Sequence, residues 1–290
     1  TSIIGRELLT SFNGESLLPK KIQYKDFAFW QKSNLENESF KKEEDYWLNV
    51  FNEEIDVLNL PIDFPRPLIQ SFEGARVGFY LDKDILDALN KVAKDTGVTV
   101  NMILLTVFKT LLYRYTNQQE IVVGMPIAGR AVNEFYNVMG AFVNTIVLKS
   151  RIENNATFRD LLNLTKSNLF NALANQNYPF DELIKKIKVN RDPRRNPLFD
   201  VMFVMDSIES DVGQSESALN FEYEFKQITS KVDLSLIGVK NKVGIDFQVE
   251  YCTKLFKSET IDRFIKHYTN ILEVVLQNPS TGLNEICFLS

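Results

Sequence analysis

The chain alternates between two periods of hydrophobic and polar positions, and the alternation predicts a mixed fold. Apolar residues about three and four positions apart predict helices, whereas short β-branched runs bounded by Gly or Pro predict strands. The helical pattern occurs at 3–12, 24–51, 84–94, 100–115, 158–174, 181–188 and 258–276. The strand pattern occurs at 76–81, 121–123, 142–148, 198–205, 220–228, 232–239 and 243–251. We therefore expect an α/β sandwich, a mixed β-sheet covered by helices.

The helix predicted at 100–115 is apolar on nearly all sides. Thr99 is expected to cap its start, and Gly97 to end the helix before it. A helix without a polar face is buried on most sides, so we expect a central helix packed against the sheet. A Lys240-Asn241-Lys242 turn joins the last two strand patterns and predicts a hairpin. The acidic and polar stretch 207–217 predicts a surface loop.

The stretch 121–150 reads as two apolar strands around a polar loop. Gly124 and Pro126 are expected to end the first strand. The loop contains Gly129-Arg130, and the second strand contains Asn144 and Thr145. Spacing alone leaves two interpretations open. The segment is either an ordinary loop with a surface arginine, or a polar site on a buried scaffold.

Two further segments have unusual composition. DVLNLPIDFPRP, residues 56–67, contains three prolines in seven residues, so it is predicted to be extended and is the best boundary candidate. YKDFAFW, residues 24–30, contains four aromatic residues. They could form a stacking platform for bases, but their helical spacing and the acidic background favour a packing face.

Composition narrows the possible partners. The chain has 290 residues, a net charge of −5 and 44% hydrophobic residues, which predicts a globular protein without a nucleic-acid partner. Cys252 and Cys287 fit neither a disulfide framework nor a zinc site, which suits a reducing cytoplasm. No apolar run reaches the roughly 20 residues of a membrane span, so we expect no membrane partner. The chain begins at Thr1 rather than Met, and we expect it to be a piece of a longer protein. One basic cluster is interpreted as a solvated helix face and a charged loop: Lys185, Lys186, Lys188, Arg191, Arg194 and Arg195.

The sequence contains no familiar catalytic motif. The only histidine, His267, lies in a predicted helix and is interpreted as a packing or surface residue. There is no nucleophile elbow, P-loop, GxGxxG or HExxH motif, and we expect no metal site. Some polar residues nevertheless occupy apolar or constrained places, where they must be hydrogen-bonded or serve a site. They are Arg130, Asn144, Thr145, Asn196 and Asp233.

Six motifs occur along the chain in an order typical of one protein family. YKDFAFW is similar to YxDFAxW, and LNLPIDFPRP to LPxDxPRP, with Phe64 where a charged residue is common. PIAGR resembles PxxGR, and MGAFVNT resembles GxFVNT. NQNYPF resembles the YPF motif, and RDPRRNPL resembles RDxSRNPL, with Arg194 at the usual serine. In this order the six motifs resemble those of the condensation domain of nonribosomal peptide synthetases, and the resemblance covers essentially the whole chain.

The resemblance implies a fold and a reaction. It implies chloramphenicol-acetyltransferase-like lobes, with residues 1–55 as trailing helices of the N-terminal lobe, 56–70 as a crossing segment and 71–290 as the C-terminal lobe. The reaction is amide formation between a donor aminoacyl or peptidyl thioester and an acceptor aminoacyl thioester. Upstream and downstream carrier proteins deliver both on phosphopantetheine arms. LNEICFLS, residues 283–290, resembles the segment before an adenylation domain, which is a further expected partner.

The family's catalytic HHxxxDG motif does not occur in the chain. The resemblance therefore implies no catalytic residue here, a His pair upstream of Thr1, and an inactive isolated chain. It makes Arg130 a candidate ion-pair partner for the aspartate of that motif. Asn144 and Asn196 are candidate supporting residues of the active site, and Thr145, Asp233 and Ser235 are candidate tunnel-lining residues. Two alternatives stay open: an epimerization or heterocyclization domain of the same fold, or a noncatalytic carrier-docking module.

Overall fold

The computed structural model describes residues 2–17, 19, 21–35, 37–130, 132–188, 192–207 and 229–289. Contacts divide the chain into two compact units. Unit 1 comprises 1–53, 126–146 and 173–188, and unit 2 comprises 54–125, 147–172 and 189–290. Two segments of the predicted C-terminal lobe, 126–146 and 173–188, thus group with the N-terminal helices. The predicted boundaries at residues 55 and 70 separate lobes of the fold, which are not the same as the two contact units. These boundaries therefore stay a prediction.

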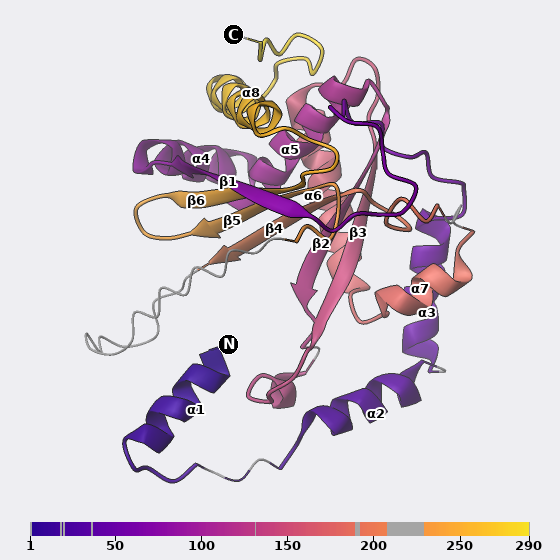
Figure 1. The fold of residues 1–290 in the computed structure, drawn as a ribbon, viewed down its shortest axis with the longest axis vertical. Helices are drawn as coiled ribbons and strands as arrows, with labels where there is room; N and C mark the ends of the chain where they lie inside the picture. Colours follow the sequence, from indigo (N-terminus) through magenta and orange to yellow (C-terminus); the bar gives the residue numbers. More distant parts are fainter. Residues whose placement is uncertain are drawn as a thin grey trace. The chain divides into compact units, whose positions relative to one another are not determined.

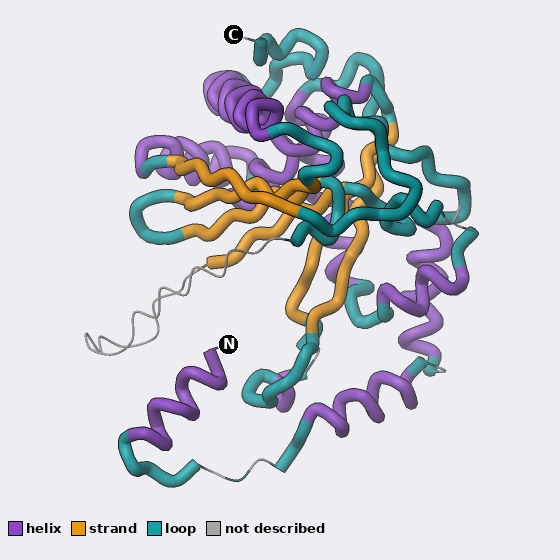
Figure 2. The backbone as a smooth tube through the Cα atoms, in the orientation of Figure 1, coloured by secondary structure: helices purple, strands orange, loops and turns teal. Residues whose placement is uncertain are grey.

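Six strands among the described residues form one mixed sheet (Figures 1 and 2). Its spatial order is β1 (Gly74–Leu81), β6 (Ile245–Cys252), β5 (Leu234–Lys240), β4 (Val201–Ser207), β2 (Glu120–Ala128) and β3 (Val143–Arg151). Strand β6 runs antiparallel to both neighbours, whereas β4 runs parallel to β5 and β2. The predicted mixed sheet and the β5–β6 hairpin are therefore confirmed.

Helices α4 (Lys83–Thr96), α5 (Val100–Thr116) and α8 (Ser258–Gln277) pack together. Helix α5 is the predicted central helix, because it is buried continuously from Met102 to Tyr113. The Thr99 hydroxyl accepts a hydrogen bond from the Met102 N–H at 3.2 Å, and Gly97 is left-handed at φ 65°. Both predicted caps are thus confirmed. Helix α6 (Phe158–Ala174) has its predicted bounds.

Some strand boundaries differ from the prediction. Strand β2 continues through Gly124 and Pro126, which were expected to end it. Gly124 serves close packing, because a Cβ there would lie 2.5 Å from the Phe199 ring. Strand β4 begins at Val201 rather than at 198. The predicted strand at 220–228 and most of the predicted loop at 207–217 lie outside the described residues.

Unit 1 contains short elements around the ends of two strands. Its helices are α1 (Ser2–Phe12), α2 (Tyr24–Asn34), α3 (Glu38–Val50), the 3₁₀ helix η1 (Asn133–Phe135) and α7 (Phe180–Lys186). The helix predicted at residues 3–12 is present as α1, but two of its apolar residues, Leu8 and Phe12, are 64% and 89% exposed.

The proline-rich segment has no helix or strand, as predicted, and it connects to α8 through Asp63. The two carboxylate oxygens of Asp63 accept hydrogen bonds from the Lys257 N–H at 2.8 Å and the Thr260 hydroxyl at 2.9 Å. Burial works to raise the pKa of Asp63, but these two hydrogen bonds and nearby cations outweigh it, so the pKa is lowered. Asp63 therefore supplies a charged acceptor at the N-terminal end of α8.

None of the described helices is by itself long and apolar enough to cross a membrane. Helices α4 and α5 meet that requirement only as a pair, and they are bent by 99° where they join.

Candidate functional site

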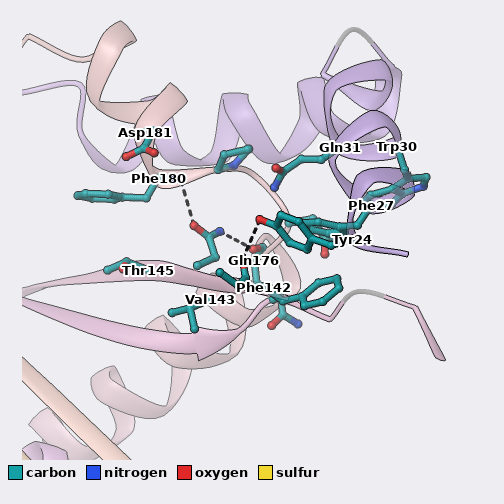
Figure 3. A pocket seen from close by; sticks show the side chains of 15 residues that line it. Tyr24, Phe27, Trp30, Gln31, Phe142, Val143, Thr145, Gln176, Phe180 and Asp181 are labelled. Atoms are coloured by element: carbon teal, nitrogen blue, oxygen red, sulfur yellow. Dashed lines mark hydrogen bonds between the residues drawn. The ribbon is translucent and has the colours of Figure 1, made fainter. Parts of the chain in front are cut away.

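A hollow of about 320 Å³ lies in unit 1 beside the start of β3 (Figure 3). Segments of four sequence motifs form its walls. Figure 3 shows Tyr24 and Trp30 on α2 and, across the hollow, Val143 and Thr145 on β3. The third wall is the segment 176–181, which leads into α7. Aromatic rings thus meet amide side chains around one opening, a combination typical of small-molecule sites.

The aromatic wall is a packed cluster. Phe27 is 5% exposed, and its ring centroid lies 4.6 Å from that of Phe142 and 5.2 Å from that of Phe135. The Tyr24 hydroxyl donates to the Ala141 carbonyl at 3.0 Å. The prediction that this segment packs against the core is therefore confirmed for Phe27. Phe29, two residues further along the helix, is 74% exposed.

Arg130 ties the polar loop to η1. Its Nη1 donates to the carbonyls of Phe135 and Val138, the latter at 2.9 Å, and its guanidinium lies 4.2 Å from the centroid of the Phe142 ring. The preceding Gly129 closely approaches the Phe142 carbonyl, and a Cβ there would collide with that oxygen. The Gly-Arg pair therefore combines close backbone packing with a half-buried cation, and Arg130 is not a free surface charge.

Asn144 connects β3 to the loop 175–180. Its Nδ2 donates to the carbonyls of Gln176 and Tyr178, both at 2.9 Å. Its Oδ1 accepts from the N–H of Phe180 at 3.1 Å. A polar residue in an apolar strand thus finds partners on the loop backbone, as the sequence required.

Glu43 on α3 holds the same loop from another element, and sequence reasoning missed it. Glu43 is 6% exposed, and its carboxylate accepts hydrogen bonds from the N–H groups of Asn177 and Tyr178, both at 2.9 Å. Trp47 adds a hydrogen bond from Nε1 to the Asn175 carbonyl at 2.8 Å. The missed signal was helical spacing, because Glu43 lies three residues after Phe40 and four before Trp47, on the buried face.

The other predicted site residues divide between the units. Thr145 lines the hollow next to Asn144. Asn196, half-buried before β4, and Asp233 and Ser235, both buried at the start of β5, belong to unit 2. The structure thus brings Asn144 and Thr145 together at one hollow, while Arg130 lies next to a lining residue, Gly129.

Asp233 belongs to a buried cluster of charges in unit 2. It forms a two-pronged ion pair with Arg66 of the proline-rich segment, in which Nη1 and Oδ1 are 2.9 Å apart. A second pair joins Arg195 to Asp200 at 2.6 Å. Burial and the neighbouring Asp233 charge raise the pKa of Asp200 to about 6. The cluster joins the PRP and RRNPL motifs to the sheet. Arg195 is thus part of a buried pair, unlike the exposed Lys185 and Lys186.

Lys109 is a second buried charge that the sequence did not single out. It lies on α5 with no exposed surface, and its Nζ donates to the Ser150 hydroxyl at 2.8 Å. Burial lowers the pKa of Lys109 to about 7. Asn168 of α6 also reaches the Ser150 hydroxyl, at 3.4 Å. Because Lys109 is enclosed in the core, its role is structural.

His267 is a packing residue, as interpreted from the sequence. Its Nδ1 lies 2.7 Å from the Tyr115 hydroxyl, and its ring packs edge-on against Phe288. Burial and two neighbouring cations, Arg263 and Lys266, lower the pKa of His267. Across the part of the chain that the structure describes, no group of three His, Cys, Asp or Glu residues is arranged to hold a metal ion.

The whole chain matches one family profile and parts of known peptide synthetases. The profile of the Condensation domain family matches residues 1–290. The chain is 40% identical over 292 aligned residues to gramicidin S synthase 2 from Brevibacillus brevis, covering 100% of this chain and 7% of the synthase. It is 41% identical to bacitracin synthase 2 from Bacillus licheniformis, covering 99% of this chain and 11% of that protein. The chain thus spans only a small fraction of these relatives.

Solved structures share the fold at lower identity. A four-domain nonribosomal peptide synthetase bound to AMP and glycine matches 88% of this chain and 20% of its own, with a TM-score of 0.79 at 22% identity. The X-domain from teicoplanin biosynthesis, in complex with OxyB, matches 100% of this chain and 66% of its own, with a TM-score of 0.86 at 17% identity. The chloramphenicol-acetyltransferase-like fold expected from the sequence is confirmed. On the profile match and the 40% identity to peptide synthetases, the chain belongs to the condensation-domain family.

Proposed function

We propose that this chain is part of a domain that forms an amide bond between two carrier-bound thioesters. The donor would be an aminoacyl or peptidyl thioester and the acceptor an aminoacyl thioester, each on the phosphopantetheine arm of a carrier protein. The observation that carries this proposal is the 40% identity to peptide synthetases over the whole chain. An adjacent adenylation domain is a further proposed partner.

The hollow in unit 1 is proposed as part of the wall along which a tethered substrate lies. Its aromatic side offers apolar contact, and its side-chain amides at Gln31, Gln176 and Asn177 offer hydrogen bonds. A phosphopantetheine arm alternates methylene groups with amides, so this wall fits its chemistry. Asn144 and Asn196 remain proposed supporting residues of the active site, and Thr145, Asp233 and Ser235 remain proposed tunnel-lining residues. Of these five, Asn144 and Thr145 line the hollow.

In this reaction the residues of the hollow would hold the substrates in place rather than react with them. The acceptor amine attacks the donor thioester carbonyl, a C–N bond forms, the C–S bond breaks, and the amine loses a proton as the thiolate leaves. Holding two tethered reactants in contact contributes a large part of such a rate enhancement. The lining residues of the hollow include one carboxylate, Asp181, and no histidine. We propose that the proton-handling histidine lies on an HHxxxDG segment outside these 290 residues, and that Arg130 pairs with the aspartate of that segment.

The test uses the synthetase module that contains this chain, with both carrier proteins loaded and their loading verified by mass spectrometry. We expect the donor acyl group to appear in amide linkage on the acceptor arm, and we expect no product from the isolated 290-residue chain. Loaded carriers that yield no amide with the intact module would refute the function. Arg130→Ala in the module should impair folding or amide formation, and unchanged rates together with unchanged stability would refute its role.

One observation favours a second function, a noncatalytic docking module. The X-domain from teicoplanin biosynthesis shares this fold and forms a complex with OxyB. The fold by itself is therefore compatible with binding alone. The amide assay separates the two, because a docking module would retain carriers without forming product. An epimerization domain would instead invert the stereochemistry of the tethered residue, which chiral chromatography of the released residue detects. A heterocyclization domain would cyclise the residue with loss of water, which mass spectrometry detects.

A further inference from the structure

The loop 175–180 is fixed by a buried carboxylate that lies outside the recognised motifs and the lining of the hollow. We propose that Glu43 is a positioning residue, which sets the backbone of this loop so that one wall of the hollow is formed before a substrate enters. The consequence for the substrate rests on the proposed function. The consequence for the loop rests only on the contacts of Glu43.

The geometry places the Glu43 charge on loop backbone groups. Oε2 accepts from two consecutive N–H groups, those of Asn177 and Tyr178, each at 2.9 Å. Oε1 accepts from the Asn177 Nδ2 at 3.1 Å. Within the described part of the chain, no Lys or Arg pairs with Glu43, although the adjacent Glu44 pairs with Lys186 at 2.6 Å. The loop donors are thus the partners of a 6% exposed anion, and such charge-assisted hydrogen bonds are the strong kind.

Glu43 and Asn144 use complementary groups of the same loop. Asn144 binds the carbonyls of residues 176 and 178 and the N–H of residue 180, whereas Glu43 binds the N–H groups of 177 and 178. Together they fix five backbone groups within five consecutive residues. Because Gln176, Asn177 and Phe180 line the hollow, their placement follows from that backbone. Figure 3 shows Phe180 across the hollow from Thr145.

Amide hydrogen exchange on the 290-residue chain tests the loop directly. In Glu43→Leu we expect exchange of the Asn177 and Tyr178 N–H groups to be at least about ten-fold faster, because both lose their acceptor. Exchange within α5 should stay unchanged. The matched control is Asp45→Asn, which removes a charge from an exposed position of the same helix. Equal exchange of residues 177 and 178 in wild type and Glu43→Leu would overturn the proposal. Should Glu43→Leu not fold, Glu43→Gln keeps the volume, and a rise of at least about three-fold is expected because a neutral acceptor is weaker.

Kinetics of the intact module test the consequence for catalysis. For Glu43→Gln we expect kcat for amide formation to fall at least about five-fold, with an unchanged apparent KM for the acceptor carrier, because positioning rather than docking is lost. Asp45→Asn should match wild type. Faster exchange at residues 177 and 178 with a wild-type kcat would overturn the catalytic role of Glu43. A wild-type module that forms no amide would refute the proposed function, whereas the exchange experiment would still decide whether Glu43 positions the loop.

Discussion

The two units bury polar side chains in different ways. In unit 1, Glu43 and Asn144 direct their hydrogen bonds to the backbone of a single loop. In unit 2, Arg66 and Asp233 pair with each other and so join the proline-rich segment to β5. The first arrangement sets the shape of a loop beside a hollow, and the second fastens distant segments of one core. The contacts of Glu43 and Asn144 should therefore affect mainly local order, whereas the Arg66–Asp233 pair should affect mainly global stability.

The largest expected effect is on the ion pair in unit 2. Asp233→Ala leaves the Arg66 guanidinium buried without its carboxylate, because the Arg66 side chain is only 10% exposed. Removing one partner of a buried pair typically costs about 3–5 kcal/mol. We expect a loss of that size in the free energy of unfolding, measured by urea titration with far-UV circular dichroism, because both tryptophans, Trp30 and Trp47, lie in unit 1. The matched control is Asp87→Asn, which breaks an exposed pair with Lys83 and should leave the urea midpoint nearly unchanged. A small effect of Asp233→Ala would remove the contrast between the units.

The second prediction concerns pH and Lys109. The pKa of Lys109 is about 7 in the folded chain and its ordinary value is 10.5. Below pH 7 the amine is protonated in both states, whereas between these values the unfolded chain binds the proton and the folded chain does not. Stability should therefore rise with pH in this window, by about 2–3 kcal/mol between pH 7 and 9, because the slope grows toward 1.4 kcal/mol per unit above the folded pKa.

Lys109→Met provides the control for that slope. The substitution removes the titrating group from a fully buried site, so the rise between pH 7 and 9 should largely disappear. The variant should also be the more stable protein at pH 7, since no amine is then buried. Identical pH profiles for wild type and Lys109→Met would show that Lys109 does not titrate in this range.

A smaller effect is expected in unit 1. Asn144→Ala removes three hydrogen bonds to the loop backbone, and each is worth about 1 kcal/mol net. Because the loop can regain some hydrogen bonds to water, we expect a loss of about 2 kcal/mol in unfolding free energy. We also expect faster hydrogen exchange of the Phe180 N–H, which loses its acceptor. Asn163→Ala, at an exposed position of α6, should cause no loss. A global effect as large as that of Asp233→Ala would contradict a local role for Asn144.

Much of this molecule follows from local patterns in the sequence. The caps at Thr99 and Gly97 and the all-round apolar pattern of α5 depend on neighbours along the chain, so they could be predicted. The continuation of β2 through Gly124 could not, because it depends on Phe199 packing over that glycine. The motif around Asn144 located one wall of the hollow. The partners of Asn144 could not be predicted, because they lie on a loop more than thirty residues away.

Residues hidden in ordinary patterns were the hardest to predict. Glu43 lies in a charged helix among other acidic residues, and only its spacing from Trp47 distinguishes it. Arg66 and Asp233 are 167 residues apart, so their pairing is a property of the fold. Lys109 lies in the middle of an apolar helix, where the pattern predicts burial but does not identify its hydrogen-bond partner.

If the hollow in unit 1 is a wall of the amide-forming site, blocking its opening should slow the reaction. Val143 lines it and is 70% exposed, so Val143→Trp adds bulk at the opening without disturbing the core. Val243 is 59% exposed between β5 and β6, and Val243→Trp makes the same change away from the hollow. Single-turnover amide formation by the intact module, with both carriers loaded, compares the two. We expect at least about a ten-fold slower reaction for Val143→Trp and a wild-type rate for Val243→Trp. Wild-type rates for both variants would contradict this role of the hollow.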